Sequence, residues 1–267
     1  MPDIHIAKYE CMENDFCIVD GDRDPLVWTP RRVSRVCHRR RGVGSDGLVI
    51  LRSVTSSSVR FRLFNADGSK AEWSGNGVRC AAAFLRDQYG MTEFVMRTLA
   101  GPIPVFCRRR QGRRTTVSII CSVPVLQPAV DGVKIHARGA RGPYAVDAGN
   151  PHWVYLVSGF DFDWEKVGLR CQEATPATRG VNVEFVKIAD EKQIEMRLFE
   201  RGVGPTPSSG SGALAGSLVC RHLKLVGPQV RIVSPGGIQT ADYESDRGTV
   251  RMTAIASFVF AGEVALP

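Results

Sequence analysis

Two short segments carry residues that could do chemistry at the start of a helix. They are Ser74-Gly75-Asn76-Gly77 and Ser209-Gly210-Ser211-Gly212, and each runs into a stretch of small apolar residues. Glycines let the backbone approach a ligand closely, and the first N–H groups of a helix have no partner within it. The helix dipole is positive at this end, so such a segment binds anions, including carboxylates. We therefore predict two anion-binding helix starts, each with a serine hydroxyl beside it.

A serine in front of a helix also has a plainer role. Its side chain caps the helix by accepting a hydrogen bond from a backbone N–H group. For one isolated segment capping is the better interpretation, but the occurrence of the segment twice favours a shared function. If the two helix starts face one cleft, they can hold one carboxylate while Ser74 and Ser209 approach the neighbouring carbon from opposite sides.

The spacing around the two segments indicates an internal duplication. Ser74 and Ser209 lie 135 residues apart, about half of the 267-residue chain, and each follows an Arg-Leu-Phe triplet whose arginine lies twelve residues earlier. Three further pairs of landmarks keep a similar offset and the same order: Asn14-Asp15-Phe16 with Asn150-Pro151-His152, Gly42-Val43-Gly44 with Gly180-Val181-Asn182, and Ala100-Gly101-Pro102 with Gly236-Gly237-Ile238. We predict an N-terminal half, residues 1–130, and a C-terminal half, residues 131–267, with the boundary in a stretch rich in Gly, Ala and Arg.

Each half alternates between strand and helix patterns. Runs of β-branched and aromatic residues with partial alternation predict strands. Three such strands precede the serine segment in each half: residues 16–19, 48–51 and 59–64 in the first, and 153–157, 183–186 and 194–199 in the second. A helix follows each serine segment and is expected to end at Gly90 in the first half and near Gly227 in the second, because glycine favours the position after a helix. The predicted fold class is α/β (α+β).

Composition and charge exclude several classes of protein. Apolar residues make up 43% and charged residues 23%, which is ordinary for a globular domain. No apolar run is long enough to span a membrane and the N-terminus lacks the apolar region of a signal peptide, so we expect a cytoplasmic protein with no membrane partner. The net charge is +8, with arginine clusters at 39–41, 108–110 and 113–114. Without interleaved aromatic residues these clusters indicate a solvated basic face that attracts an anionic small substrate, and no nucleic-acid partner is expected.

The eight cysteines indicate neither a metal site nor a disulfide framework. They are Cys11, Cys17, Cys37, Cys80, Cys107, Cys121, Cys171 and Cys220. None forms a CxxC pair and most lie in apolar runs, so zinc ligation is not expected. Without an export signal, buried free thiols are the default interpretation.

Six segments resemble the signature segments of the diaminopimelate epimerase family, in the family's order and across nearly the whole chain. They are Asn14-Asp15-Phe16, Asn65-Ala66-Asp67-Gly68, Ser74-Gly75-Asn76-Gly77-Val78-Arg79-Cys80, Gly149-Asn150-Pro151-His152, Glu200-Arg201-Gly202-Val203-Gly204 and Pro235-Gly236-Gly237. The resemblance implies two similar halves, each a barrel-like, mostly antiparallel sheet around a central helix, with the active site in the cleft between them. It also implies an enzyme that interconverts LL- and meso-diaminopimelate, a precursor of lysine and peptidoglycan, without pyridoxal phosphate, metal or any other cofactor. A homodimer is expected by the same analogy.

The resemblance also implies roles for single positions. Gly75, Asn76, Gly210 and Ser211 match the donors to the reacting α-carboxylate, and His152 matches the family's active-site histidine. An arginine suits a carboxylate, and a glutamate with amide oxygens suits an ammonium group. Six residues match positions that hold the distal amino-acid end of the substrate: Asn14, Asn65, Asn150, Asn182, Glu200 and Arg201.

The chain departs from the family at the residues that carry the protons. The family has a catalytic cysteine at the first residue of each helix-start segment, where this chain has Ser74 and Ser209. A thiol has a pKa near 8.5, which a helix N-terminus lowers further, whereas a hydroxyl ionises several units higher at about 1.36 kcal/mol per unit. As catalytic groups the two serines therefore need an activating neighbour, for which Asp67 and His152 are the candidates.

Neighbouring positions also differ from the family's usual residues. Trp73, Pro205, Ser208 and Leu214 replace them, and of the eight cysteines only Cys80 and Cys11 lie at a possible substitute position in a signature loop. Four interpretations stay open. The protein is an epimerase that uses serine, an isomerase or racemase of the same fold acting on a related substrate, a catalytically weak protein that binds diaminopimelate, or a cysteine enzyme in which both residues have been replaced. The differences at the neighbouring positions argue against a cysteine enzyme with two replaced residues.

Overall fold

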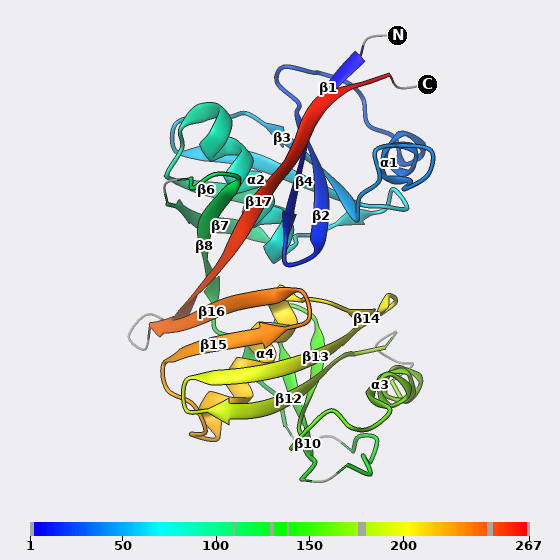
Figure 1. Cartoon of the computed structure of the whole chain (residues 1–267), viewed down its shortest axis with the longest axis vertical. Helices are drawn as coiled ribbons and strands as arrows, with labels where there is room; N and C mark the ends of the chain where they lie inside the picture. Colours follow the sequence, from blue (N-terminus) through cyan, green and yellow to red (C-terminus); the bar gives the residue numbers. More distant parts are fainter. Residues whose placement is uncertain are drawn as a thin grey trace. The chain divides into compact units, whose positions relative to one another are not determined.

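The chain folds as two compact units, which are shown in Figure 1. The computed structural model describes residues 3–108, 110–128, 131–137, 139–175, 180–244 and 248–265. The first unit comprises Met1–Ile120 and Thr253–Pro267, and the second comprises Cys121–Met252. Each unit contains one of the two serine segments.

The first unit is a ring of eight strands with two helices. Its elements in chain order are β1 (Asp3–Cys11), β2 (Asn14–Asp20), α1 (Pro30–Cys37), β3 (Gly47–Arg52), β4 (Ser58–Asn65), β5 (Lys70–Ala71), α2 (Gly75–Tyr89), β6 (Glu93–Thr98), β7 (Gly101–Cys107), β8 (Arg114–Ser122) and the C-terminal part of β17 (Thr249–Ala265). The ring runs β1–β2–β3–β4–β6–β7–β8–β17 and closes because β17 pairs with β1. The β2–β3 and β4–β6 ladders are parallel, which requires a crossover between their strands.

Helix α2 forms the centre of the first unit. It is buried from Gly75 to Leu85 and packs against β1, β2, β3 and β7. Its middle turns are alanines, and small side chains let the surrounding strands come close at the density of a protein interior. The helix ends at Gly90, whose φ of 69° is left-handed, so the predicted glycine stop is confirmed.

The second unit repeats this order of elements. They are β9 (Val125–Leu126), β10 (Arg141–Asp147), β11 (Pro151–Leu156), α3 (Trp164–Glu173), β12 (Asn182–Asp190), β13 (Gln193–Glu200), β14 (Gly204–Thr206), α4 (Gly210–His222), β15 (Gln229–Ser234) and β16 (Gly237–Glu244). The strands pair in the order β9–β10–β11–β12–β13–β15–β16, and the ladders β11–β12 and β13–β15 are again the parallel ones.

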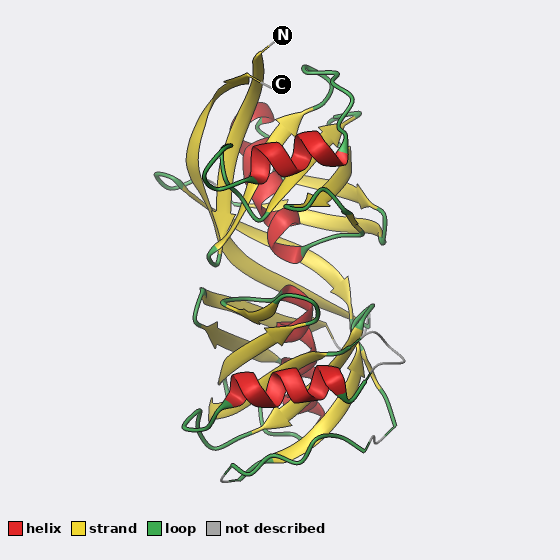
Figure 2. Cartoon of the chain, turned by 90° about the vertical axis from the view of Figure 1, so that its right-hand side faces the viewer, coloured by secondary structure: helices red, strands yellow, loops and turns green. Residues whose placement is uncertain are grey.

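The helices occupy equivalent places in the two units. Helix α4 packs against β10, β11, β12, β13 and β15, as α2 packs against the strands of its own unit. Figure 2 shows α1 and α3 each lying on the outside of the strands of its own unit. The repeat in pairing, crossovers and helices confirms the predicted fold class, two pseudo-symmetric mixed α/β halves with a central helix, and all six predicted strands overlap observed ones.

Two predicted segment ends differ from the structure. Helix α4 ends at His222, not near Gly227, because Lys224 adopts a left-handed φ of 56° and its N–H group donates to Arg221 O in a closing turn. The expected boundary between residues 130 and 131 also differs from the division at Ile120, and residues from Thr253 onward return to the first unit. The physical reason is the long antiparallel ladder of β17 with β1, from Asp3–Ala265 to Cys11–Ala256.

Some residues used in the sequence analysis lie outside the described part of the chain. They are Arg109 of the second arginine cluster and residues 129, 130 and 138 near the expected boundary. Within the described part, no helix is long and apolar enough to cross a membrane.

Candidate active site

The two serines occupy equivalent positions at the starts of the central helices. Ser74 precedes α2 with φ −145° and ψ 130°, and its Oγ accepts a hydrogen bond of 3.2 Å from the N–H group of Gly77. Ser209 precedes α4 with φ −144° and ψ 132°, and its Oγ accepts at the same distance from Gly212. Both serines therefore cap their helices. In each helix the N–H groups ahead of these glycines lie beyond the reach of any carbonyl of the same helix, as an anion site requires.

Glu200 lies beside the second of these helix starts. It ends β13, and its carboxyl group is hydrogen-bonded by the Ser209 side chain. Burial raises the pKa of Glu200 above its ordinary value, and the nearby Glu184 charge acts in the same direction. The hydrogen bond from Ser209 and the electrostatic effect of His152 lower this pKa but do not outweigh burial. A carboxyl group with a raised pKa is a better base near neutral pH. The resemblance assigned Glu200 to the distal end of the substrate, whereas its contact in this unit is with Ser209.

A buried histidine and glutamate complete this cluster. His152 lies at the start of β11 and pairs in register with Asn182 on the parallel strand β12. Its Nδ1 lies 2.8 Å from Glu184 Oε1 and its Nε2 lies 2.8 Å from Asn150 Oδ1. Oxygen atoms lie next to both ring nitrogens, and the tautomer of His152 decides which nitrogen donates. His152 and Glu184 are each only 1% exposed, so this contact is buried.

Glycine at position 212 makes room for this carboxylate. A Cβ atom at Gly212 would lie 2.8 Å from Glu184 Oε1 and 3.2 Å from the Ser209 Cβ. Glu184 therefore sits directly against the first turn of α4. Its other oxygen, Oε2, is buried and has no hydrogen-bond partner in the described part of the chain. The second unit thus gathers His152, Glu184, Glu200 and Ser209 at one helix start.

Asn182 and Arg201 are linked through the backbone. The Asn182 side chain donates to Pro151 O over 3.2 Å and accepts from the Arg201 N–H group over 2.9 Å. The Asn182 side chain is buried and the Arg201 side chain is exposed. Gly210 and Ser211, the predicted carboxylate donors, are the first two residues of α4 and are half-buried.

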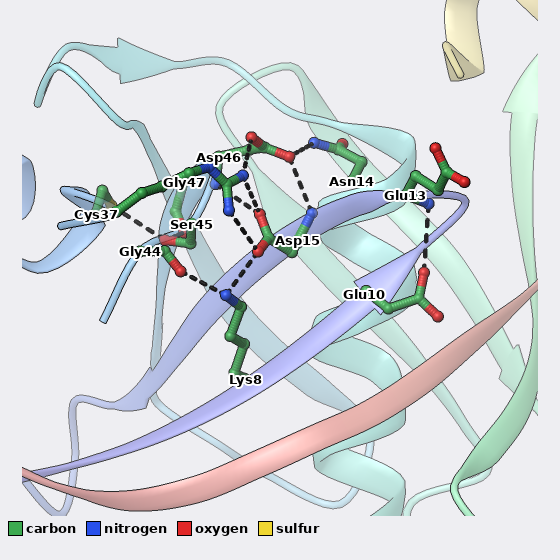
Figure 3. A network of polar contacts seen from close by, with 11 residues as sticks. Lys8, Glu10, Glu13, Asn14, Asp15, Cys37, Gly44, Ser45, Asp46 and Gly47 are labelled. Atoms are coloured by element: carbon green, nitrogen blue, oxygen red, sulfur yellow. Dashed lines mark hydrogen bonds and ion pairs between the residues drawn. The ribbon is translucent and has the colours of Figure 1, made fainter. Parts of the chain in front are cut away.

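In the first unit, the structure brings Asn14 and Asn76 together. Asn14 begins β2, and its Nδ2 donates to Asp46 Oδ2 over 2.8 Å. Asn76, the second residue of α2, is buried, and its Nδ2 donates to Asn14 Oδ1 over 3.5 Å. Figure 3 shows Asn14 and Asp46 within a wider network that includes Asp15 and Lys8.

Asp15 is the charged centre of that network. Burial alone would raise its pKa, but hydrogen bonds from Arg39 and Lys8 outweigh burial and hold the pKa below its ordinary value. Lys8 Nζ lies 2.7 Å from Asp15 Oδ2, and Arg39 Nη2 bridges Asp15 and Asp46 at 2.9 and 2.8 Å. These ion pairs fix the turn that precedes β3 against the start of β2.

Asn65 and Asp67 form a separate turn after β4. Asn65 is exposed and its Nδ2 donates to Ser69 Oγ over 2.9 Å. Asp67 accepts from the Ser69 N–H and hydroxyl groups at 2.8 and 2.6 Å, and these bonds lower its pKa. The side-chain hydrogen bonds of Asp67 thus run to Ser69, and those of His152 run to Glu184 and Asn150. The carboxyl group that accepts a hydrogen bond from the Ser209 side chain is that of Glu200.

The cysteines offer no substitute for the two serines. Seven of the eight are buried free thiols, as predicted, and Cys121 is half-buried. Burial raises the pKa of Cys11 to about 11 and that of Cys80 well above its ordinary value, so neither is a thiolate near neutral pH. The described residues contain no cluster of three or more His, Cys, Asp or Glu side chains that could hold a metal ion.

Two functional candidates were missed by the sequence analysis. Glu184 lies between the apolar residues Val183 and Phe185 of β12, and a charged side chain at a buried strand position was the available signal. Asp46 follows a Gly-Val-Gly-Ser segment that was noted only for its glycines. The partners of both residues are far away in the sequence, 32 residues in each case, at His152 and Asn14.

Comparison with known proteins places the chain in a family. The diaminopimelate epimerase family matches residues 6–119 and 144–259. Proteins named diaminopimelate epimerase from Desulforudis audaxviator and Halorhodospira halophila are 36% and 34% identical to it. The first match covers 97% of this chain and 99% of the relative, and the second covers 99% and 96%.

Solved structures share the fold at much lower identity. A phenazine biosynthesis protein of the PhzF family from Bacillus anthracis aligns with a TM-score of 0.73 at 16% identity, covering 99% of this chain and 100% of that one. A hydroxyproline epimerase from Agrobacterium vitis, solved with bound trans-4-hydroxy-L-proline, aligns with a TM-score of 0.72 at 12% identity, covering 99% and 91%. The family match over most of the chain and the relatives at 36% and 34% identity show that the chain belongs to the diaminopimelate epimerase family of isomerases.

Proposed function

We propose that this protein interconverts LL- and meso-diaminopimelate by removing the proton at Cα from one face and returning a proton to the other. The observation that carries the proposal is the pair of equivalent serine-capped helix starts, one in each unit, in a chain whose family relatives are named for this reaction. In the proposed complex both helix starts face one substrate, with Ser74 and Ser209 on opposite sides of Cα.

The helix starts would stabilise the charge that develops in the reaction. Gly75 and Asn76 from α2, with Gly210 and Ser211 from α4, would offer backbone N–H groups to the α-carboxylate. Loss of the Cα proton pushes negative charge onto that carboxylate, and fixed donors aimed at it lower the barrier without having to reorganise. The positive ends of two helix dipoles add to this effect.

Ser209 has the partner that a hydroxyl needs in order to act as a base. Its hydroxyl proton is directed at Glu200, whose pKa is raised by burial. In the proposed step Glu200 takes the hydroxyl proton while Ser209 Oγ takes the Cα proton, so that one proton moves onto Oγ as another moves onto the carboxylate. Ser74 would donate its hydroxyl proton to the opposite face of Cα. The proton then held by Glu200 would leave to solvent and a solvent proton would return to the Ser74 oxygen, which restores both groups.

The remaining site residues would hold the distal end of the substrate. Arg201 would bind the distal carboxylate, and Asn14, Asn65, Asn150 and Asn182 would supply amide groups for the distal carboxylate and ammonium groups. His152, which contacts Glu184 and Asn150, would keep its ring in a fixed orientation near Glu200. The expectations of a homodimer and of a cytoplasmic location stay predictions, and light scattering of the purified protein tests the first.

Deuterium uptake tests the proposed function. The protein is incubated with LL- or meso-diaminopimelate in D₂O, and we expect deuterium at Cα together with the appearance of the other isomer. Ser209→Ala and Ser74→Ala should each abolish the appearance of the other isomer, because inversion needs a group on both faces of Cα. If calorimetry detects binding but neither isomer exchanges, the epimerase proposal is wrong and the protein is a binder.

A second candidate is an isomerase or racemase acting on a related amino acid. It is favoured by the serines, since they depart from the residues that the family uses on diaminopimelate. A panel of free amino acids incubated in D₂O decides between the two. Exchange with another amino acid and none with diaminopimelate would establish this second candidate.

A further inference from the structure

The side-chain amides of Asn14 and Asn76 belong to one directed chain of hydrogen bonds. Arg79 Nη1 donates to Asn76 Oδ1 over 3.2 Å, Asn76 Nδ2 donates to Asn14 Oδ1 over 3.5 Å, and Asn14 Nδ2 donates to Asp46 Oδ2 over 2.8 Å. This series of hydrogen bonds joins helix α2 to the start of β2 and to the turn before β3. All of it lies within the first unit.

The two ends of this chain fix its direction. An arginine can only donate hydrogen bonds and an ionised carboxylate can only accept them, whereas an amide group can do either when it is turned over. Arg79 is fully buried on α2 and so holds the oxygen of Asn76 toward itself. Asp46 holds the nitrogen of Asn14 in the same way. Turning either amide over would set two donors or two acceptors against each other.

Asp46 is itself held firmly in place. Its N–H group donates to Asp15 Oδ1 over 2.9 Å, and its Oδ2 accepts in return from the Asp15 N–H group over 3.1 Å. Arg39 Nη2 donates to the other oxygen, Asp46 Oδ1, over 2.8 Å. Figure 3 shows these bonds converging on Asp46 and Asp15 from both sides. Arg39 therefore occupies Oδ1 of Asp46, while Oδ2 accepts from both the Asp15 N–H group and the Asn14 amide nitrogen.

We propose that Asp46 is a positioning residue that holds Asn14 with its amide oxygen turned toward the Asn76 side chain, and that it thereby selects a ligand with a distal ammonium group. The inference rests on the proposed function, because it assumes that Asn14 contacts the substrate. An amide oxygen has two lone pairs, and the long bond from Asn76 occupies one of them. The other accepts from an N–H donor and disfavours a carboxylate at the same place.

The test uses the Asp46→Asn variant of the full chain. An asparagine at 46 offers one oxygen in place of two, so either Arg39 or Asn14 meets an N–H group and loses its acceptor. Asp22→Asn is the matched control, because Asp22 is also an exposed aspartate of the first unit and its Oδ2 accepts a bond of 3.1 Å from the Val54 N–H group. It belongs to no part of the candidate site.

Two ligands and one spectrum supply the readouts. Calorimetry compares the affinity for meso-diaminopimelate with that for 2-aminopimelate, which lacks the distal ammonium group. We expect wild type and Asp22→Asn to prefer diaminopimelate by about tenfold or more, the equivalent of one hydrogen bond to a charged group, and Asp46→Asn to lose that preference. In ¹⁵N–¹H spectra of the free protein, the Asn14 side-chain amide should exchange slowly with water in wild type and rapidly in Asp46→Asn.

The outcomes separate this inference from the proposed function. If Asp46→Asn keeps the wild-type preference and the slow Asn14 amide, the role of Asp46 is refuted while the proposed function stands. If wild type binds neither ligand, the proposed function is wrong and the selection of an ammonium group falls with it. The amide spectrum then still decides whether Asp46 fixes Asn14.

Discussion

Ser74 and Ser209 begin their helices with the same geometry, to within a few degrees of φ and ψ and with equal cap distances of 3.2 Å. In each case Oγ accepts a hydrogen bond from a helix N–H group, which leaves the hydroxyl proton to be donated elsewhere. At Ser209 the proton is donated to Glu200. Capping and proton transfer are therefore compatible roles of one hydroxyl, and the plainer interpretation of these serines does not compete with the chemical one.

The cap at Ser209 can be measured apart from its chemistry. Ser209→Ala should lower the free energy of unfolding by about 0.5–2 kcal/mol, whereas Ser209→Gly should cost only a few tenths, because glycine is tolerated at this position. Both variants lack the hydroxyl and should lose Cα exchange equally. Urea denaturation checks the stabilities, and equal losses of stability in the two variants would show that Ser209 does not cap α4.

The two helix-start glycines should respond differently to alanine. A Cβ atom at Gly212 would lie 2.8 Å from Glu184 Oε1 and 2.9 Å from Leu198 Cδ2, whereas the nearest atom at Gly77 is 3.3 Å away. We expect Gly212→Ala to destabilise the protein by about 1–3 kcal/mol through overpacking. Gly77→Ala should change stability by no more than about 1 kcal/mol, since alanine favours a helix. Urea denaturation of the two variants compares them, and equal effects would contradict the packing of Glu184 against α4.

Because the pKa of Glu200 is raised, we expect the Glu200→Gln variant to have a higher free energy of unfolding than wild type, by an amount that depends on pH. In the unfolded chain this carboxyl group ionises near its ordinary value of 4.5, but burial delays its ionisation in the folded state. Wild type therefore loses stability relative to the variant as the pH rises above about 4.5, and the loss levels off above the folded pKa. Below 4.5 both states are neutral and the difference disappears.

Unfolding free energies of both proteins between pH 4 and 8 measure this difference. Glu93→Gln, at an exposed position in β6, is the matched control for removing one negative charge. A stability difference that stays constant across this pH range would contradict the burial of an ionisable Glu200.

Returning thiols to the two helix starts should accelerate the reaction. In the double variant Ser74→Cys with Ser209→Cys, the rate of Cα deuterium exchange should rise by at least about tenfold, because a thiol ionises several pKa units below a hydroxyl. Ser56→Cys, in an exposed turn, is the control for adding a thiol elsewhere. An unchanged or slower rate would mean that these positions do not carry the protons.

The sequence predicted what depends on local pattern. The serine segments, the small residues of α2 and the Gly90 stop all act within a few residues of one another, and the structure confirms each. Lys224 shows the limit, because few residues other than glycine adopt a positive φ and nothing in its neighbourhood indicates that it does.

Long-range contacts could not be predicted in this way. The pairing of Asp3 with Ala265 closes the first unit between the two ends of the chain, and no local pattern specifies it. The contacts of Glu184 with His152 and of Asp46 with Asn14 likewise depend on which strands the fold places side by side. The sequence suggested candidate substrate-binding residues such as Asn14 and His152, but not Asp46 and Glu184, which contact them.

A crystal structure of the protein with bound meso-diaminopimelate tests the central claim most directly. We predict that one α-carboxylate receives N–H groups from the starts of both α2 and α4, with Ser74 Oγ and Ser209 Oγ on opposite sides of the same Cα. A ligand bound at one helix start alone, with the other hydroxyl in a separate pocket, would contradict the account.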